Sequence, residues 1–236
     1  KKVMRIGVIL CSVGNQFYDD IIAGLRESER ENSIYHIEVL YRYMKGYDVK
    51  EQLKLMEELK EKVQCLILTA IDDIQIAHKI DEYMEDGIGV FTLNTDISGS
   101  KRIRHIGVDV LECGRIACGL LALLCQEKGK VLIATGSLTL LESRNRIFAF
   151  CSTMHSRHPG IKLAEIIETQ DDTEEAYHKM NEFLSRGVEI QAVFIAGGGV
   201  TGICRALEEH GMQEIRVVAC DTVPSVCQLM EEKKIQ

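Results

Sequence analysis

Two arginines, Arg144 and Arg146, stand in the amphipathic segment SRNRIFAF, which follows a hydrophobic run and a polar turn. Because they are two positions apart, a helix would direct their side chains to different sides. A guanidinium carries five N–H donors, which suit hydroxyl and carboxylate oxygens. We therefore expect one of the two arginines, Arg146, to face a binding site and the other to be a tolerant surface residue.

Further polar residues and glycines follow the predicted β-strands. Carboxylates, amides and an arginine exchange hydrogen bonds with vicinal hydroxyl groups, and an aromatic ring covers the apolar face of a sugar ring. This inventory predicts a site for a small sugar or another polyol. The predicted ligand-binding residues are Asn15, Phe17, Tyr18, Thr69, Asp72, Asn94, Thr95, Ser137, Arg146, Asp171, Gly197, Gly198 and Asp221. Other strand-end residues are Ser12, Asp73, Asp96 and Gly199.

Simpler roles are open for some of these residues. Asp72, Asp171 and Asp172 stand where aspartates cap helices, and Tyr18 is of a type that packs inside a domain. The sequence is equally compatible with these structural roles and with ligand contact.

A zinc site is a second chemistry to consider. Cys151 and His155 are four residues apart and would share one helix face, with His158 close by. No fourth ligand is evident, and short matches of this kind arise by accident. We expect an ordinary polar helix end and no metal.

A dinucleotide site is the third. The segment GGGVTG at 197–202 fits the pattern G-x-G-x-x-G, follows a predicted strand and precedes Asp221 by about 20 residues. Only 34 residues follow Gly202, too few for the rest of a nucleotide-binding sheet or a catalytic domain. No nucleophile with an adjacent base stands elsewhere. We therefore expect neither an enzyme nor a cofactor.

The elements that position these residues are eight β-rich runs alternating with amphipathic segments. Their spacings are about 30, 27 and 25 residues in the first half and about 31, 30 and 24 in the second. This doubling predicts an α/β fold of two similar lobes, 1–107 and 108–236, each a parallel sheet flanked by helices on both faces. The runs are MRIGVIL, IEVLYRY, VQCLIL, GVFTLN, KVLIAT, IKLAEII, QAVFIA and IRVVAC, and RIRHIGVDVLECG bridges the lobes.

Helix starts and helix faces are also predicted. An Asp or Thr followed three residues later by Glu or Gln marks five helix starts, at Asp48, Asp72, Asp109, Thr139 and Asp172. Three apolar stripes at helical spacing are expected in the core. They are Val49, Leu53, Met56 and Leu59; Ile116, Leu120 and Leu124; and Tyr177, Met180 and Leu184.

Ligands of open parallel sheets bind outside the carboxyl ends of the strands. Two lobes with those edges facing one another would hold a ligand in a cleft between them. A ligand that contacts both lobes would favour the closed form.

Composition excludes several classes of protein. A net charge of −8 opposes the basic footprint that duplex DNA requires. No apolar run reaches 18 residues, so no membrane segment is expected. Nine cysteines, an odd number without a C-x-x-C pair, predict free thiols and a reduced, cytoplasmic compartment.

A set of segments, in this order and spacing, resembles a known family. They are IGVIL with NQFYDDIIAGL, VFTLNTDI, HIGVDVLECGRIA, ATGSLTLLESRNRIFAF, VFIAGGGVTGICRALEEHG and VVACDTVPS. Over nearly all 236 residues, the chain resembles the type I periplasmic-binding-protein fold and, within it, the effector-binding part of lactose-repressor-like (LacI family) transcription regulators.

The resemblance implies roles for particular residues. Arg146 in RIFAF matches the family's sugar-contacting arginine, and Asp221 matches its strand-end aspartate. Asn15 and Phe17 match the asparagine and the aromatic residue of its first loop. Two departures, Asn94-Thr95 in place of Asp-Arg and Gly197-Gly198 in place of Asn-Asp, imply a ligand other than simple pentoses and hexoses. The glycines would let backbone amides approach it.

The resemblance also implies partners. A LacI-type chain would sense a sugar or polyol and act as a homodimer, touching DNA only through an N-terminal helix-turn-helix, which is not visible in this sequence. A further C-terminal strand and helix, usual in such chains, is not visible either. The alternative is a solute-binding protein of a sugar transporter or a sensor receptor, which has the same lobes and the same sugar chemistry.

Overall fold

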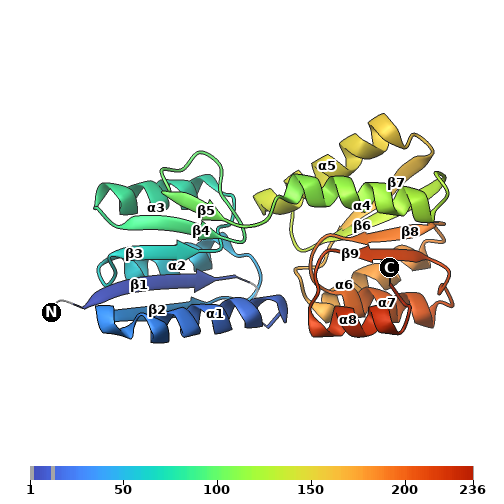
Figure 1. The fold of residues 1–236 in the computed structure, drawn as a ribbon. Helices are drawn as coiled ribbons and strands as arrows, with labels where there is room; N and C mark the ends of the chain where they lie inside the picture. The colour runs from blue at the N-terminus through green and yellow to red at the C-terminus, as the bar shows by residue number, and fades with distance from the viewer. Residues whose placement is uncertain (1–2, 12–13, 236) are drawn as a thin grey trace. The chain divides into compact units, whose positions relative to one another are not determined.

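The computed structural model describes residues 3–11 and 14–235 and forms two compact units (Figure 1). Unit 1 comprises Lys1–Val108 with Thr139–Glu142, and unit 2 comprises Asp109–Leu138 with Ser143–Gln236. The segment Thr139–Glu142, expected in the second lobe, groups with unit 1 because the Asp72 N–H donates to the Thr139 carbonyl at 3.1 Å. The predicted residue Ser12 lies outside the described residues.

Unit 1 is built on a five-stranded sheet in the order β2-β1-β3-β4-β5, with every pair parallel. Helices α2 and α3 pack on one face around Met56, Leu66 and Ile80, and α1 packs on the other around Val8 and Leu10. The elements are β1 (Met4–Leu10), α1 (Phe17–Glu31), the 3-10 helix η1 (Ser33–Tyr35), β2 (Ile37–Tyr43), α2 (Val49–Lys60), β3 (Cys65–Leu68), α3 (Ile74–Glu85), β4 (Gly89–Leu93) and β5 (Arg104–Ile106).

Unit 2 is built on a four-stranded parallel sheet in the order β7-β6-β8-β9. Helices α4 and α5 pack on one face around Leu121 and Phe150, and α6, α7 and α8 pack on the other around Met180, Ile203 and Leu229. The elements are α4 (Val110–Leu124), β6 (Gly129–Thr135), α5 (Leu141–Arg157), β7 (Ile161–Glu168), α6 (Thr173–Ser185), β8 (Ala192–Ile195), α7 (Val200–Glu209), β9 (Arg216–Ala219) and α8 (Pro224–Glu231).

The predicted fold class is confirmed: each unit is a parallel sheet with helices on both faces. Strands buried on both faces are continuous apolar runs, and β8, with all four residues buried, is the clearest example. All eight predicted strands are present. Strand β5 was predicted as part of the bridge, because its three partly exposed residues make no apolar run.

Three of the five predicted helix caps are present. The carboxylates of Asp48, Asp109 and Asp172 each accept a backbone N–H of the first turn. The prediction for Asp72 is wrong by one residue, since Asp73 accepts the Gln75 N–H at 2.8 Å and caps α3. In the Thr139 pattern, the Glu142 carboxylate accepts the Asp96 N–H at 2.6 Å, and the cap at Thr139 stays a prediction.

Two of the three apolar stripes contribute to the core as predicted, with Met56, Leu59, Met180 and Leu184 buried. The stripe on α4 is a wrong prediction, because Ile116 and Leu120 are exposed. Helix α4 is apolar on nearly all sides, so periodicity alone does not select its buried face. The face that packs on the sheet carries Ala117, Cys118, Leu121 and Ala122.

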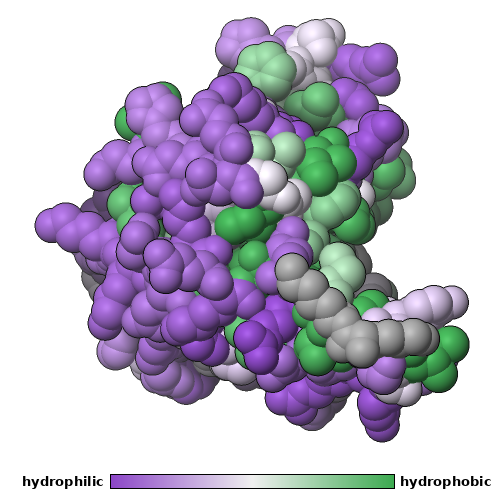
Figure 2. Space-filling view, turned by 90° about the vertical axis from the view of Figure 1, so that its left-hand side faces the viewer, coloured by the Kyte–Doolittle hydropathy of each residue, from purple (hydrophilic) through white to green (hydrophobic). Residues whose placement is uncertain are grey.

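Helices α2 and α3 of unit 1 carry exposed ion pairs. Lys79 of α3 lies 2.9 Å from the Glu57 carboxylate of α2 and 2.7 Å from that of Glu82. Figure 2 looks from the left-hand side of Figure 1 and shows hydrophilic residues over much of the surface. None of the helices described is long and apolar enough to cross a membrane.

Candidate ligand-binding site

Polar residues gather at the carboxyl edge of the unit 2 sheet. Gly136 follows β6, Asp171 follows β7, Gly197 follows β8 and Asp221 follows β9. Because the four strands are parallel, their carboxyl ends meet at one edge (Figure 1). This is the edge where ligands bind in open α/β sheets.

The Asp171 carboxylate lies against the backbone of Gly136, Gly197 and Gly198. Its Oδ1 accepts the Gly198 N–H at 2.6 Å. A Cβ atom on Gly136 would stand 2.4 Å from Oδ2, and one on Gly197 would stand 2.5 Å from Oδ1. A side chain at either position would therefore force the Asp171 carboxylate to move. The Gly198 amide, which was expected to approach the ligand, instead donates to this carboxylate.

Arg146 reaches this edge from α5. Its Nη1 donates to the carbonyl of Ala196, directly after β8. Its Nε is buried and has no hydrogen-bond partner among the described residues. A buried donor without an acceptor costs about 1–3 kcal/mol. An acceptor oxygen brought by a ligand would remove that cost.

Asp221 completes a charged cluster. Burial raises the pKa of its carboxyl above the ordinary value, the positive charge of Arg146 opposes this shift, and Asp171 adds to it. Burial also raises the pKa of the neighbouring Cys220 thiol to about 11. The edge thus holds two carboxylates and one guanidinium, which supply both acceptors and donors for hydroxyl groups.

The loop after β6 is fixed by two side chains. The Glu168 carboxylate accepts the Leu138 N–H at 2.7 Å and the Ser137 hydroxyl at 3.1 Å. Arg144 donates to the Leu138 carbonyl at 2.7 Å. Arg144 is thus a support of this loop, which corrects its prediction as a tolerant surface residue. Ser137 is buried and its hydroxyl points to Glu168 instead of to an open edge.

Glu168 was missed by the sequence analysis. It is the last residue of β7. The sequence analysis selected polar residues at the ends of predicted strands, such as Asp221, and this strand-end rule would have selected Glu168 too. The predicted strand ended at Ile167, one residue too early.

At unit 1, the first loop and the end of β4 lie together. The Asn15 side-chain oxygen accepts the Phe17 N–H at 3.0 Å. The rings of Phe17 and Tyr18 meet edge to face at 5.5 Å. Asn94, in the left-handed region at φ 63°, donates from Nδ2 to the Tyr18 hydroxyl at 3.4 Å. Asn15, Phe17 and Asn94 are partly exposed, whereas Tyr18 is buried in its unit.

Two threonines have structural roles in place of the predicted ligand contact. Thr69 is fully buried; its hydroxyl accepts the Cys11 N–H at 2.7 Å, and its carbonyl accepts from Gln52 at 2.9 Å. Thr95 is buried and donates to the Ala70 carbonyl at 2.9 Å. The strand-end rule finds these positions but does not tell which way their side chains point.

Two aspartates of unit 1 also form hydrogen bonds with residues of the same unit. The Asp72 carboxylate accepts the Ser98 N–H at 2.7 Å, so it holds the loop after β4. Burial would raise the pKa of Asp96, but hydrogen bonds from Arg102 and Thr92 bring it below the ordinary value. Both carboxylates therefore have intramolecular roles; for Asp72 this is the structural role that the sequence left open beside ligand contact.

The zinc pattern does not assemble. His158 Nδ1 lies 2.8 Å from the Glu127 carboxylate. Across the described part of the chain, no three His, Cys, Asp or Glu side chains come together as a metal site would require. All nine cysteines are free thiols in the structure.

The glycines of GGGVTG have packing roles. Gly199, at φ +87°, precedes α7 in a conformation that side chains rarely adopt. A Cβ on Gly202 would stand 2.0 Å from the Thr173 carbonyl oxygen, so this glycine lets α7 pack against α6. A dinucleotide's pyrophosphate would need the amides here. The Gly198 N–H already binds the Asp171 carboxylate, whose charge repels a phosphate.

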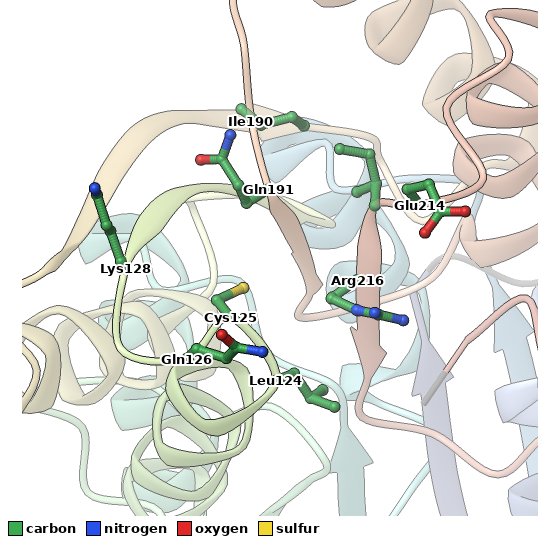
Figure 3. Close-up of a pocket in the computed structure, with 9 residues that line it drawn as sticks. Leu124, Cys125, Gln126, Lys128, Ile190, Gln191, Glu214 and Arg216 are labelled. Carbon is green, nitrogen blue, oxygen red and sulfur yellow. The ribbon is translucent and has the colours of Figure 1, made fainter.

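A pocket of about 260 Å³ opens elsewhere on unit 2 (Figure 3). It lies by the amino ends of β6, β8 and β9, at the opposite edge of the sheet from Asp221. None of the predicted ligand-binding residues lines it. Its lining is Leu124, Cys125, Gln126, Lys128, Ile190, Gln191, Glu214, Ile215 and Arg216.

Comparison with known proteins identifies relatives. Residues 6–236 match the family model described as periplasmic binding protein domain. The ribose import binding protein RbsB of Escherichia coli (strain K12) is 21% identical over 220 residues, which cover 93% of this chain and 73% of RbsB.

Two solved structures are also similar. The glucose-galactose binding protein GanP of Geobacillus stearothermophilus superposes with a TM-score of 0.90 at 20% identity, over 100% of this chain and 84% of that one. A solute binding protein from Burkholderia graminis C4D1M, in complex with D-arabinose, gives a TM-score of 0.90 at 20% identity, over 100% and 83%. These likenesses confirm the expected fold.

All three relatives are described as binding proteins. This agrees with the expectation that the chain is not an enzyme. None of the three is described as a transcription regulator.

Proposed function

Because this chain belongs to the periplasmic binding protein domain family, we propose that it binds a small sugar or polyol at the carboxyl edges of its sheets. The chain holds the ligand and does not convert it. The residues proposed to contact the ligand are Asn15, Phe17, Asn94, Arg146, Asp171 and Asp221.

The cluster around Arg146 carries this proposal. Among the described residues its buried Nε has no acceptor, while its Nη1 donates to the Ala196 carbonyl. The Asp221 carboxylate lies within electrostatic range of this guanidinium and of the Asp171 carboxylate. A guanidinium held in place donates along a fixed direction, and the carboxylates accept from adjacent hydroxyls. A polyol matches this alternation of donors and acceptors.

The relatives support a carrier of sugar more than a regulator. RbsB is named for ribose import, and the Burkholderia graminis protein is an ABC transporter component that holds D-arabinose. We therefore propose a solute-binding protein of a sugar transporter or of a sensor receptor. That function would place the chain outside the cytoplasm.

The LacI-type regulator is the second candidate. It is favoured by the nine free cysteines, which suit a reduced compartment. In that case the chain would be cytoplasmic and would control DNA through a separate helix-turn-helix. The sequence upstream of Lys1 in the parent gene decides between them: a signal peptide supports the carrier, and a basic helix-turn-helix supports the regulator.

A ligand screen tests binding itself. The purified chain is melted with pentoses, hexoses and their polyols, each at about 10 mM, and with NAD as a comparison. At 100 times the dissociation constant, a ligand stabilises the folded state by about 2.7 kcal/mol. We expect at least one sugar or polyol to raise the melting temperature, without turnover of that ligand. A rise with NAD alone, or steady NAD-dependent turnover, would contradict the proposal.

A further inference from the structure

Two cysteines of unit 2 stand near the Arg146 cluster. Cys113 is in the first turn of α4, and Cys220 follows directly after β9, next to Asp221. Both are free thiols, and both residues are partly exposed. The proposed sugar contacts use neither thiol. A pair of thiols in one place can be oxidised to a disulfide, so their relative position matters.

The packing of α4 on β9 aligns the two cysteines. Ala117 of α4 and Val218 of β9 belong to one buried cluster, against which Cys220 also packs. Cys113 is one turn before Ala117 and shares its helix face. Cys220 is two residues after Val218 and shares its face of the sheet. A helical turn spans about 5.4 Å and two strand residues about 6.6 Å, so the two steps are nearly equal.

Both steps lead to the carboxyl edge of the sheet. Near the start of α4, a Cβ on Gly114 would stand 2.2 Å from the carbonyl oxygen of Arg146, whose side chain reaches Ala196 at that edge. Near its end, Leu124 lines the pocket at the amino ends of the strands. Helix α4 therefore begins at the carboxyl edge, where Cys220 also stands.

We propose that Cys113 and Cys220 are a redox pair, which a low-molecular-weight disulfide converts to an intramolecular disulfide bridge, and that this bridge weakens the ligand site beside it. Formation of the bridge depends only on unit 2. The effect on affinity rests on the proposed function.

The surroundings of Cys220 assign the order of the two steps. Burial raises the pKa of its thiol to about 11, the charge of Arg146 opposes this rise, and Asp221 and Cys113 add to it. Because the thiolate is the nucleophile, Cys220 is a poor first attacker at neutral pH. Cys113 therefore makes the first attack, and Cys220 resolves the product.

The exchange balances in thiols and disulfides. The Cys113 thiolate attacks one sulfur of glutathione disulfide, forms a mixed disulfide and releases one glutathione thiolate. The Cys220 thiolate then attacks the Cys113 sulfur and releases the second glutathione. Each leaving thiolate takes up the proton that a cysteine has lost. Two cysteines are oxidised to one disulfide, and one glutathione disulfide is reduced to two thiols.

The bridge would act on Asp221. A disulfide holds its two Cβ atoms about 3.8 Å apart, so the backbone must adjust to the bond. The start of α4 is held by the Asp109 cap and by the close packing of Gly114 on α5. The segment after β9 lies in no helix or strand until Pro224. This segment therefore moves, and Asp221 moves with it relative to Arg146.

Peptide mapping tests the bridge. The folded protein is treated with excess glutathione disulfide, remaining thiols are blocked with N-ethylmaleimide, and tryptic peptides are analysed without reduction. The peptide 105–115 contains Cys113, and the peptide 217–233 contains Cys220 and Cys227. The variant Cys227→Ser is therefore used, because it leaves Cys220 as the only cysteine of the second peptide. We expect these two peptides to be linked in most molecules and to separate on reduction.

A second pair of cysteines is the internal comparison. Cys118 of α4 lies within electrostatic range of Cys151 of α5, but Cys118 is fully buried and out of reach of glutathione disulfide. It should remain a thiol in the folded protein. Recovery of Cys113 and Cys220 as blocked thiols or as separate mixed disulfides would overturn the proposal. An equal yield of a bridge between Cys118 and Cys151 would do the same.

Calorimetric titration tests the effect on the ligand site. The pentose, hexose or polyol that raises the wild-type melting temperature most is titrated into the bridged and the reduced Cys227→Ser protein. The bridge should raise the dissociation constant at least about threefold, and dithiothreitol should reverse this. The double variant Cys113→Ser, Cys227→Ser, verified as folded by circular dichroism, should bind equally with and without oxidant. Equal affinity of bridged and reduced protein would overturn the effect on the ligand. Absence of any sugar binding would refute the proposed function, while the peptides still decide whether the bridge forms.

Discussion

Removal of the Arg146 side chain should destabilise the protein in a pH-dependent way. In Arg146→Ala the Ala196 carbonyl loses its side-chain donor, and Asp221 loses the positive charge that holds its pKa down. If Arg146 served only the ligand, its removal would hardly affect folding. The structure predicts otherwise, because Arg146 contacts its own unit.

The size of the effect follows from the lost contacts. A hydrogen bond from a charged donor contributes about 1.5–3 kcal/mol, and each unit of pKa shift corresponds to about 1.4 kcal/mol. Because Arg146 and Asp221 are both partly exposed, we take the low end and expect about 2 kcal/mol at pH 7. For a chain of this size that lowers the melting temperature by about 4–8 °C.

The pH dependence has a defined sign. A carboxyl whose folded pKa is raised supports folding below its unfolded pKa of about 3.9, and this support is lost as pH rises through the folded pKa. Arg146→Ala raises the pKa of Asp221 further, so the loss at neutral pH grows. As pH falls, Asp221 becomes protonated in both proteins, and the difference between them should shrink toward the part due to Ala196.

Thermal and urea unfolding between pH 3.5 and 8, without ligand, measures this. The control is Arg157→Ala, an exposed arginine at the end of the same helix, which should change the stability by less than about 0.5 kcal/mol. A deficit of Arg146→Ala that is constant across this range, or equal to that of Arg157→Ala, would refute the electrostatic argument.

Two other perturbations have clear outcomes. Gly136→Ala should lower the free energy of unfolding by about 1–3 kcal/mol in urea titrations, since its Cβ would stand 2.4 Å from the Asp171 carboxylate. The control is Gly24→Ala, in open space within α1, which should stabilise the protein by about 0.5–1 kcal/mol. Similar values for both variants would contradict the argument. Thiol labelling of the native protein at pH 8, followed by mass spectrometry, should modify the exposed Cys227 first, whereas Cys11, whose pKa burial raises to about 12, should react only on unfolding; early labelling of Cys11 would show that the core is open.

The fold could be predicted because buried parallel strands are continuous apolar runs at regular spacing. The roles of individual side chains were harder to predict. Thr69 and Asp221 both follow strands, yet the first is bonded inside unit 1 and the second stands at the edge. The sequence does not give the direction in which a residue points after its strand ends, so the rule selects both.

The periodicity of the sequence also did not predict which residues pack closely against one another. The need for glycine at 136 and 197 comes from Asp171, which is distant in sequence and adjacent only once β6, β7 and β8 have paired. Helix α4 carries apolar residues at helical spacing on both its buried face and its exposed face. Only the packed sheet shows which face is covered.

The central claim, that the cluster around Arg146 holds a sugar or polyol, is tested most directly by calorimetric titration. The ligand is whichever compound raises the wild-type melting temperature most, and it is titrated into the wild type, Arg146→Ala and Arg157→Ala at a temperature where all three are folded. We predict that Arg146→Ala weakens binding by about tenfold to a hundredfold, corresponding to a lost charge-assisted hydrogen bond of about 1.5–3 kcal/mol, while Arg157→Ala binds like the wild type. Unchanged affinity in Arg146→Ala, or an equal loss in Arg157→Ala, would contradict the claim.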